Sequence, residues 1–390
     1  MNSRERLTRV LKGEPVDRIP IAPFLYYNAV YEMFYYKPDM DNFYNPGYFD
    51  PITKFVEYCD FFGFDVMHTL GTVWDMYVAD TSLDKSVVRA WDNWDVTVSD
   101  QRKSDNKRRT ITIHTPEGEL RHIEKFKRTS TYLLVSAPEE SLIKTKKDFE
   151  LFRKYAPPAD FMDCSLVRRA REATGEKGLV SSCENGAFNT LARVFRSYET
   201  VLTDPISDEG FYREMMDYFT ERVIERNKKI IASGADVIEV AANLATSAVG
   251  PKYYKKYVSE YENRILHAIH EAGALNIFHN CVDAIKIMHL YNDLEIDCWG
   301  YLTTPPYGDM DLDEALRVIR PNMALRGNID QVDFMIKASP HQVKEKVRQL
   351  LQKVKARGNW ILSTTDFFFD GTPYENIKAF AEAGLEFGEY

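Results

Sequence analysis

Two potential metal ligands, His279 and Cys281, lie two positions apart in the stretch NIFHNCVDA at 276–284. In an extended chain, residues two positions apart project to the same side, so the imidazole and the thiol would face one space. Catalytic zinc takes about three protein ligands of the types His, Cys and carboxylate, and keeps a position open for substrate. The pair is therefore a candidate zinc site. A hydrogen-bonded core histidine beside an inert buried thiol is the structural alternative.

Two carboxylates could complete such a site. Glu239 lies within the apolar run DVIEVAA, where a charge is costly unless it is paired or coordinated. Asp366 directly follows the run NWILSTT. We predict that His279 and Cys281 bind the metal together with Glu239, and Asp366 is the alternative third ligand. His279, Cys281 and Asp366 are predicted to carry the chemistry.

Eight short, mostly apolar runs alternate with longer helical patterns and would position these residues. The runs cover residues 19–25, 64–70, 178–183, 235–242, 275–281, 296–302, 322–328 and 359–365. Apolar residues at nearly every position are typical of parallel strands that helices cover on both faces. Eight such units predict a (β/α)₈ barrel of the α/β class. Active sites of such barrels form on the loops after the strands, so residues that end strands four, five and eight would share one rim.

Residues 87–128, between the second and third runs, break this alternation. The segment reads as antiparallel strands around the turn-forming TPEGE at 115–119, which predicts a β insertion. The insertion either decorates the surface or covers the barrel mouth as a flap that shapes a pocket or docks a partner. No repeat, low-complexity tract or Pro-rich linker divides the sequence, so we predict one domain over residues 1–390.

Composition and charge exclude several classes of protein. A formal net charge of -9 argues against nucleic-acid binding, which needs a basic face. Five scattered cysteines without a CxxC argue against a disulfide framework and favour the cytoplasm. The charged start MNSRERLTRVLKGE and the absence of a long apolar run predict neither export nor membrane insertion. The expected partners are small molecules or another protein, and the oligomeric state is left open, with a homodimer as one option.

Further side chains near the predicted strand ends could line a substrate pocket. An aromatic mouth suits an aromatic substrate, or a cationic one through cation–π attraction. The predicted substrate-binding residues are Tyr26, Tyr27, His68, Trp74, Asn243, Asn328 and Phe367. The aromatic residues could instead pack the barrel top. His68 could be a satisfied polar group, and Asn328 could belong to a turn or helix N-cap.

The sequence opens with RERLTRVLKGEPVDRIPI, and four blocks follow later: GADVIEV, the pattern G-x-x-x-x-x-H-x-C at 273–281, LRGNID at 325–330, and NWILSTTDFFFDGTPYENIKAFAEAG. In order and spacing these blocks resemble the uroporphyrinogen decarboxylase superfamily, in which a short helix and a turn like the opening lead into the first strand. The resemblance covers essentially the whole chain outside the β insertion. The resemblance also implies a barrel.

This superfamily contains decarboxylases of uroporphyrinogen that use no cofactor. They carry an R-Q-A-G-R-Y stretch after the first strand, whose arginines hold the substrate's carboxylates. Here the stretch reads APFLYYNAVYEM, and no arginine lies between Arg18 and Arg89. The decarboxylases also carry a histidine after the last strand, where this chain has STTDFFF. We therefore expect no uroporphyrinogen decarboxylase activity.

The other chemistry of the superfamily is methyl transfer to or from a corrinoid protein, typically with zinc. That branch keeps the His-x-Cys pattern, which His279 and Cys281 match. Its coenzyme M-linked members add a cysteine near the position of residues 364–366, where this chain has none, so Asp366 or Glu239 would supply an oxygen ligand. Members that demethylate methoxylated aromatics or methylamines resemble this chain in using carboxylates with His.

The resemblance thus implies a methyltransferase that moves a methyl group from a small methylated substrate to a corrinoid carried by a partner protein, with assistance from zinc. The substrate would be a methoxylated aromatic or a methylamine-like compound. The alternative is a barrel of the same superfamily that binds a tetrapyrrole or corrinoid without methyl transfer.

Overall fold

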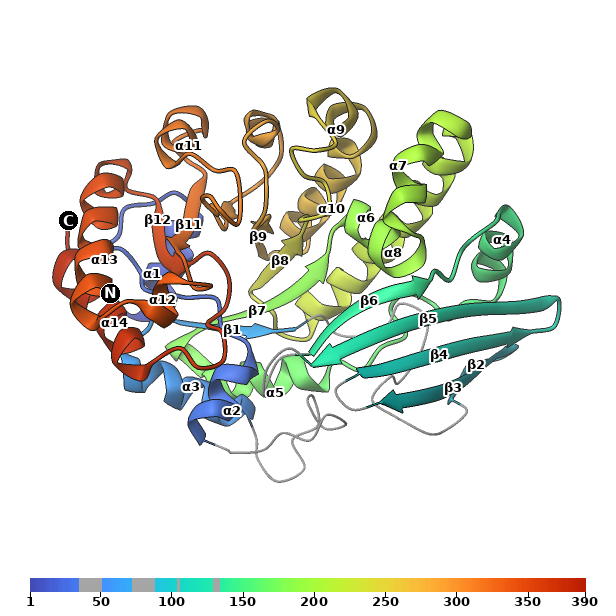
Figure 1. Cartoon of the computed structure of the whole chain (residues 1–390), viewed down its shortest axis with the longest axis horizontal. Helices are drawn as coiled ribbons and strands as arrows, with labels where there is room; N and C mark the ends of the chain where they lie inside the picture. The colour runs from blue at the N-terminus through green and yellow to red at the C-terminus, as the bar shows by residue number, and fades with distance from the viewer. Residues whose placement is uncertain (35–50, 72–87, 104–105, 129–133) are drawn as a thin grey trace.

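The computed structural model of the chain describes residues 1–34, 51–71, 88–103, 106–128 and 134–390. Its centre is a curled, seven-stranded parallel sheet of an α/β fold, with the strand order β1-β7-β8-β9-β10-β11-β12 (Figure 1). The strands are β1 (Val66–Leu70), β7 (Gly178–Asn185), β8 (Val237–Ala241), β9 (Leu275–His279), β10 (Cys298–Gly300), β11 (Ala324–Ile329) and β12 (Trp360–Thr364). Seven of the predicted runs coincide with these strands. Because all neighbouring strands of this sheet pair in parallel, the carboxyl ends of all seven strands lie on one side.

The first predicted run, residues 19–25, is not a strand in the structure, but it touches both ends of the sheet. Leu362 in β12 donates its N–H to the carbonyl of Pro20 (2.9 Å) and accepts the N–H of Ala22 (3.1 Å). Asp65, directly before β1, donates its N–H to the carbonyl of Ile21 (2.8 Å). The segment therefore connects β12 with the residue that precedes β1.

A small apolar cluster fills the space inside the curl of the sheet. Every parallel strand and the 19–25 segment contribute one buried residue each, and α1 contributes three. The buried members are Leu7, Val10, Leu11, Ala22, Met67, Leu179, Val237, Ile277, Cys298, Ala324 and Ile361. Apolar contacts from all sides of the curl hold its two ends together, because burying each such side chain contributes roughly 1.5–3 kcal/mol.

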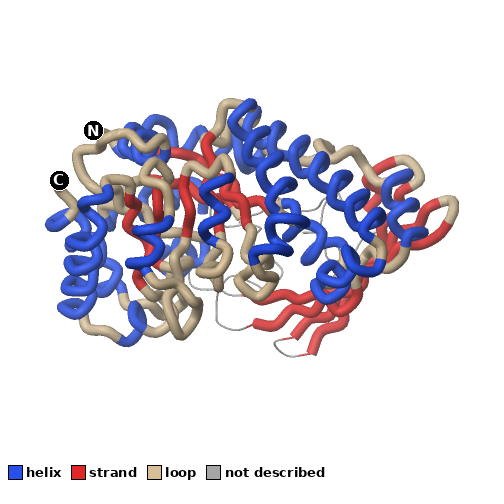
Figure 2. Tube along the Cα trace, turned by 90° about the horizontal axis from the view of Figure 1, so that it is seen from above, coloured by secondary structure: helices blue, strands red, loops and turns tan. Residues whose placement is uncertain are grey.

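Helices lie around the two sheets (Figure 2), and α1 alone among the described helices contributes residues to the cluster inside the curl. They are α1 (Ser3–Leu11), α2 (Tyr27–Phe34), α3 (Pro51–Phe62), α4 (Lys146–Tyr155), α5 (Ser165–Thr174), α6 (Ala187–Asn189), α7 (Tyr198–Ser207), α8 (Glu209–Ala232), α9 (Pro251–Tyr257), α10 (Ser259–Glu271), α11 (Leu312–Val318), α12 (Phe334–Lys337), α13 (Pro340–Val354) and α14 (Tyr374–Phe387). The π-helix η2 (Thr190–Phe195) follows α6, and three 3₁₀ turns are η1 (Gly175–Lys177), η3 (Met288–Asp293) and η4 (Lys355–Arg357). None of the helices in the described ranges combines the length and the apolar character needed to cross a membrane.

The long helix α8 shows how sequence positions one of these covering elements. Its apolar residues Phe211, Met215 and Phe219 recur every four positions and are buried. Asp208 caps its start by accepting the N–H of Phe211 (3.0 Å). Gly234 follows its end with a positive φ of 115°, a conformation that favours glycine.

A second sheet lies beside the parallel one and has five antiparallel strands in the order β2-β3-β4-β5-β6 (Figure 1). They are β2 (Val88–Trp91), β3 (Trp94–Lys103), β4 (Asn106–Thr115), β5 (Gly118–Arg128) and β6 (Leu134–Glu140). In the chain, this sheet follows β1 and precedes β7. It extends to Glu140, beyond the predicted boundary at residue 128, because β6 pairs with β5. Trp94 packs edge-on against Phe152 of α4, with ring centroids 5.7 Å apart.

Candidate active site

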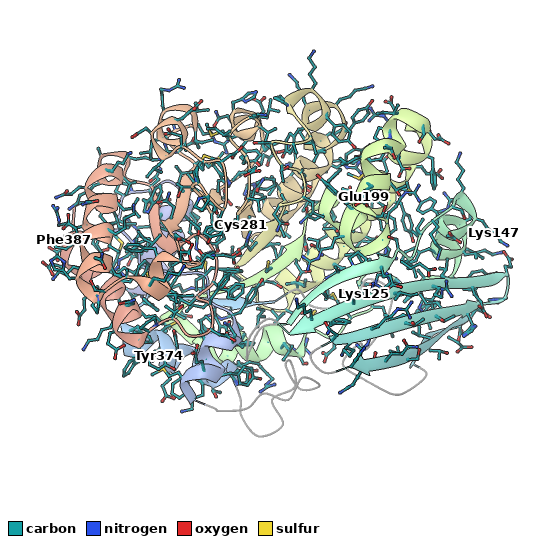
Figure 3. The ribbon with its side chains drawn as sticks, viewed as in Figure 1. Lys125, Lys147, Glu199, Cys281, Tyr374 and Phe387 are labelled. Carbon is teal, nitrogen blue, oxygen red and sulfur yellow. The ribbon has the colours of Figure 1, made fainter. Side chains whose placement is uncertain are left out.

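Three residues from two strand ends meet at the carboxyl side of the parallel sheet. His279 is the last residue of β9, Cys281 lies two residues beyond it, and Asp366 lies two residues beyond the end of β12. One ligand atom from each residue lies within 4.8 Å of the others. Cys281 is seen at the centre of the molecule in Figure 3. The structure thus brings together the three residues that the sequence singled out for chemistry.

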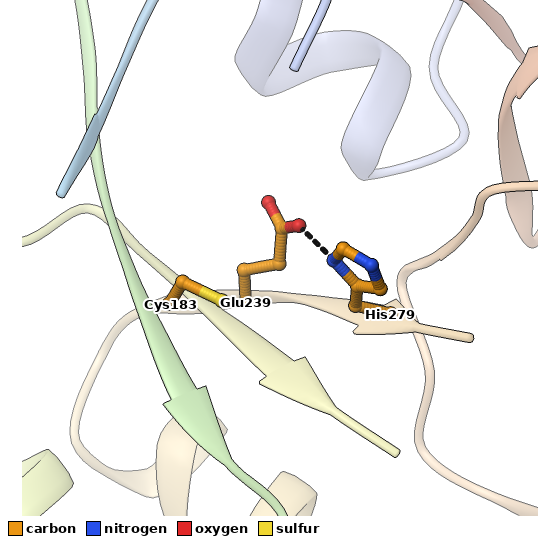
Figure 4. A group of neighbouring side chains, drawn as sticks. All are labelled: Cys183, Glu239 and His279. Carbon is orange, nitrogen blue, oxygen red and sulfur yellow. Dashed lines mark hydrogen bonds and ion pairs between the residues drawn. The ribbon is translucent and has the colours of Figure 1, made fainter. Parts of the chain in front are cut away.

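Glu239, in β8, fixes the orientation of the His279 ring (Figure 4). Its Oε1 atom lies 2.6 Å from Nδ1 of His279. The hydroxyl of Tyr301 donates to the same oxygen (3.1 Å), and Nη1 of Arg326 donates to Oε2 (3.2 Å). Since an ionised carboxylate only accepts, Nδ1 carries a proton, and Nε2 is the ring atom that could bind a metal once it is deprotonated.

Arg326, in β11, is fully buried behind this carboxylate. Its Nε donates to the carbonyl of Ala22 (3.1 Å), and its Cζ lies 4.9 Å from the ring centroid of Tyr301 and 5.8 Å from that of Phe24. Arg326 lies in the LRGNID block, and neither it nor Tyr301 was predicted from the sequence as a site residue. A signal was present for Arg326, because a charge within an apolar strand needs a partner, just as Glu239 does.

A second group of potential ligands contains Cys183, Glu239 and His279, and each offers an atom within 4.8 Å of the others. Burial raises the pKa of the Cys183 thiol well above its usual value, and the Tyr26 hydroxyl lies 3.9 Å from its sulfur. Glu239 is already neutralised by Arg326. This group therefore suits a hydrogen-bonded cluster better than a metal. Asp366, the alternative third ligand, is the carboxylate that lies in the group with His279 and Cys281.

The electrostatics of the site concentrate charge on the Glu239–His279 pair. Burial by itself lowers the pKa of His279, but Cys281 and Glu239 outweigh burial and raise the pKa well above its usual range. Burial opposes ionisation of Glu239 too, yet its bonds with His279 and Arg326 bring its pKa below the usual value. Burial raises the pKa of Asp366, and the nearby His279 opposes that shift.

Aromatic rings form a wall beside these groups. Phe24 packs edge-on against His279 and Tyr26, with ring centroids 5.3 and 4.7 Å apart. Tyr26 in turn lies 5.3 Å from Phe367, centroid to centroid. Tyr26 and Phe367 are partly buried members of the predicted substrate-binding set. Phe24 was not predicted as a site residue, since nothing in the sequence distinguishes it from the core residues around it.

His68 and Tyr27, two other predicted substrate-binding residues, contact each other. The Tyr27 hydroxyl lies 3.1 Å from Nε2 of His68, whose Nδ1 lies 2.8 Å from Oγ1 of Thr174. The His68 ring is fully buried and stacks on Phe55 at 4.2 Å. Burial lowers the pKa of His68 to about 3, so the ring is neutral. Both ring nitrogens are occupied, which fits the structural alternative better than direct substrate contact.

The two predicted asparagines connect neighbouring segments near the strand ends. Oδ1 of Asn243 accepts from Asn189 (2.7 Å), and Asn328 donates to the carbonyl of Leu302 (3.1 Å). Both are partly buried. Trp74, the remaining predicted substrate-binding residue, lies outside the described residues.

Comparison with known proteins decides the family. Residues 137–387 match the family model described as uroporphyrinogen decarboxylase (URO-D). The chain belongs to the uroporphyrinogen decarboxylase family. The matched range holds six of the seven parallel strands and includes His279, Cys281 and Asp366.

Relatives in this family include both of its chemistries. A methylated-thiol–coenzyme M methyltransferase from Methanosarcina mazei is 27% identical over 185 residues, which cover 47% of this chain and 46% of the relative. A uroporphyrinogen decarboxylase from Prochlorococcus marinus is 19% identical over 230 residues, covering 57% of this chain and 63% of the relative. The match thus spans less than two thirds of the length of either relative.

A solved structure extends the comparison to the whole chain. A methyltransferase from Methanosarcina mazei superposes with a TM-score of 0.71 at 16% identity, covering 99% of both chains. This likeness shows a shared fold. The curated methyltransferase relative supports the methyltransferase branch of the family.

Proposed function

We propose that this chain is a methyltransferase that moves a methyl group from a small methylated substrate to a corrinoid carried by a partner protein. The observation that carries the proposal is the convergence of His279, Cys281 and Asp366 within 4.8 Å at the carboxyl ends of two strands. The methyltransferase relative and the solved methyltransferase support this class of reaction. The substrate we infer is a methoxylated aromatic or a methylamine-like compound. We place the reaction in the cytoplasm, since all five cysteines are free.

We also propose that the fold is a closed (β/α)₈ barrel forming one domain over residues 1–390. The contacts of residues 19–25 with β12 and Asp65 support closure, as does the cluster to which every parallel strand contributes. In this proposal residues 19–25 take the place of the first strand, and the antiparallel sheet is an insertion between the second and third units.

The residues at the site fit a zinc ion. A histidine nitrogen, a cysteine sulfur and a carboxylate oxygen are the ligand types that zinc prefers, and three such ligands leave a position for substrate. We infer that Nε2 of His279, Sγ of Cys281 and one oxygen of Asp366 would hold it. A histidine that binds metal generally donates its other N–H to a carboxylate, as Nδ1 of His279 does to Glu239. When bound, zinc would supply Lewis-acid stabilisation of the atom that the methyl group leaves.

The chain's own residues supply orientation and shielding. Glu239 keeps a proton on Nδ1 of His279 and prevents the ring from rotating, while Arg326 and Tyr301 hold the carboxylate in place. The rings of Phe24, Tyr26 and Phe367 exclude water from one side of the site. These rings suit a methoxylated ring by stacking, or a methylated ammonium group by cation–π attraction.

Metal content and methyl transfer test the proposal together. Purified wild type should hold about one zinc per chain and should methylate cob(I)alamin when supplied with methoxylated benzoates or methylamines. His279→Ala and Cys281→Ser should lose both properties, whereas His341→Ala, on the exposed surface of α13, should keep both. Metal-free wild type, with both site variants fully active, would refute the proposal. Cobalamin binding without transfer would favour the alternative of a non-catalytic corrinoid-binding barrel.

A further inference from the structure

The loop after β10, residues 303–310, folds back on itself. The N–H of Met310 donates to the carbonyl of Thr303 (3.1 Å), which brings the two ends of the loop together. Gly308 permits this closure, because a Cβ atom there would lie 2.3 Å from the carbonyl oxygen of Thr303. No side chain fits at that distance, so any other residue at 308 would open the loop. The closed loop places Thr303 and Asp309 next to each other.

Both ends of this loop contact the stretch that carries Cys281. Oγ1 of Thr303 donates to the carbonyl of Cys281 (2.8 Å). Oδ1 of Asp309 accepts the backbone N–H groups of Ala284 (2.7 Å) and Ile285 (3.0 Å). The loop therefore holds the backbone at two places, at Cys281 and at Ala284, which lies three residues further along the chain.

Ser247, after β8, joins the same contact. Its hydroxyl donates to Oδ2 of Asp309 (2.7 Å), and its N–H donates to the carbonyl of Asp283 (2.8 Å). The hydroxyl oxygen also accepts the N–H of Lys286 (3.2 Å). Both carboxylate oxygens of Asp309 are thus engaged, and the loops after β8, β9 and β10 meet at one side chain.

Cys281 needs such support more than His279 does. His279 is the last residue of β9. The segment makes its last sheet-like contact one residue later, where the N–H of Asn280 donates to the carbonyl of Gly300 (2.6 Å). Cys281 lies beyond that contact, and backbone outside a sheet or helix is the part of a fold that moves most. The 303–310 loop supplies contacts that hold this backbone against the rest of the fold, and so keep the thiol beside His279 and Asp366.

We propose that the 303–310 loop positions the Cys281 thiol in the site and that Asp309 is its positioning residue. The role of this loop in catalysis rests on the proposed function. Its hold on the Cys281 backbone does not, since that hold consists of the contacts described above. The proposal predicts that loosening the loop changes Cys281 while the rest of the chain stays folded.

The thiol itself provides the first test. Cys281 is partly exposed and the other four cysteines are buried, so a disulfide reagent such as Ellman's should label one thiol per native chain after a chelator has removed any bound metal. Asp309→Asn and Gly308→Ala should each raise the labelling rate of Cys281 at least about threefold while the number of labelled thiols stays at one. Asp311→Asn is the matched control, because Asn is an equally good cap for α11 and Asp311 makes no described contact with residues 281–286. An unchanged or slower rate in both loop variants overturns the proposal.

Cadmium binding provides a spectroscopic test, because a thiolate bound to cadmium gives a charge-transfer absorbance that a remote fold defect would not alter. Asp309→Asn should weaken cadmium binding about 10–100-fold, which is typical when a residue that supports a metal ligand is lost. Asp311→Asn should bind as wild type does. Equal affinity in Asp309→Asn and wild type contradicts the proposal. If wild type takes up no cadmium, the proposed zinc site fails, and the labelling rates still decide the role of the loop.

Discussion

Glu239 and Arg326 form an ion pair inside the parallel sheet, with Oε2 and Nη1 3.2 Å apart and neither side chain exposed to solvent. Two charges removed from water are costly unless each compensates the other. The pair also spans the site, since Glu239 lies in β8 and Arg326 in β11. Breaking this ion pair should therefore lower both the stability and the activity of the protein.

Removing the arginine should be costly. In Arg326→Met the carboxylate of Glu239 stays buried with only the donors from His279 and Tyr301, and loss of one partner of a buried pair costs roughly 3–5 kcal/mol. Urea unfolding measures this change in the free energy of unfolding.

Two further variants make the result interpretable. Arg264→Met removes two surface ion pairs, with Asp217 and Glu221, and each should cost only about 0–1 kcal/mol. Adding Glu239→Gln to Arg326→Met should restore part of the loss, because no uncompensated charge remains. If Arg326→Met unfolds no more easily than Arg264→Met, the buried pair does not stabilise the chain as we describe.

The stability of the protein should depend on pH through Glu262. This residue of α10 is fully buried and accepts the N–H groups of Ala187 (3.1 Å) and Phe188 (3.0 Å). Burial raises its pKa from 4.5 to about 7. Between these two values the folded state keeps a proton that the unfolded state releases, so its contribution to stability is full below about pH 4.5 and is lost as pH rises towards 7.

The comparison of wild type with the Glu262→Gln variant isolates this contribution. The amide does not titrate, so the stability of wild type relative to the variant should fall by on the order of 3 kcal/mol as pH rises from 4.5 to about 7. Urea unfolding at several pH values measures this difference in the free energy of unfolding. Parallel stability curves for the two proteins would show that Glu262 does not titrate in this range.

Phe367 should contribute to substrate binding more than to chemistry. In Phe367→Ala the wall beside Tyr26 loses one ring, and an aromatic contact of about 0.5–1.5 kcal/mol corresponds to a rise in KM of roughly 2–13-fold. We expect kcat to change less than KM in steady-state methyl transfer to cob(I)alamin. Phe387→Ala, at the end of α14 away from the site, serves as the control (Figure 3). A fall in kcat alone would instead place the ring against the reacting atoms.

We expect no conversion of uroporphyrinogen to coproporphyrinogen. Between Arg18 and Arg89 the sequence has no arginine that could hold the carboxylates of such a substrate, and Arg18 itself pairs with Asp65 (2.8 Å). Incubation with uroporphyrinogen under reducing conditions, followed by chromatography of the porphyrins, measures this directly. Coproporphyrinogen formed at an enzymatic rate would show that other cations bind the substrate.

The strands were predictable because periodicity and burial leave a strong local signal. Runs such as 235–242 and 359–365 are apolar on both faces, and each became a parallel strand. The run 19–25 has the same composition but forms a single bridge, since Pro20 and Pro23 each lack an N–H to donate. Local composition alone does not reveal this difference.

Site residues could be predicted from the sequence where they lie at the end of a strand. They could not be predicted where their role depends on contacts with residues far away in the sequence. His279, Cys281 and Asp366 each follow an apolar run, so strand ends pointed to them. The partnership of Glu239 with Arg326 joins residues 87 positions apart, and only the sheet brings them together. The same holds for Asp309, whose contacts with Ser247 and Ala284 leave no trace in local sequence.

The contact of Pro20 with Leu362 also bears on how the chain is made. During synthesis, the segment 19–25 leaves the ribosome long before β12 has been made. Its hydrogen bonds with β12 therefore cannot form until residue 362 has emerged. Contacts so far apart in sequence form slowly, and a strand edge that waits for its neighbour is prone to aggregation. Nascent chains halted before β12 should therefore depend on chaperones that cover the edges β12 will later join, at β11 and residues 19–25. Release from those chaperones should coincide with the synthesis of Leu362.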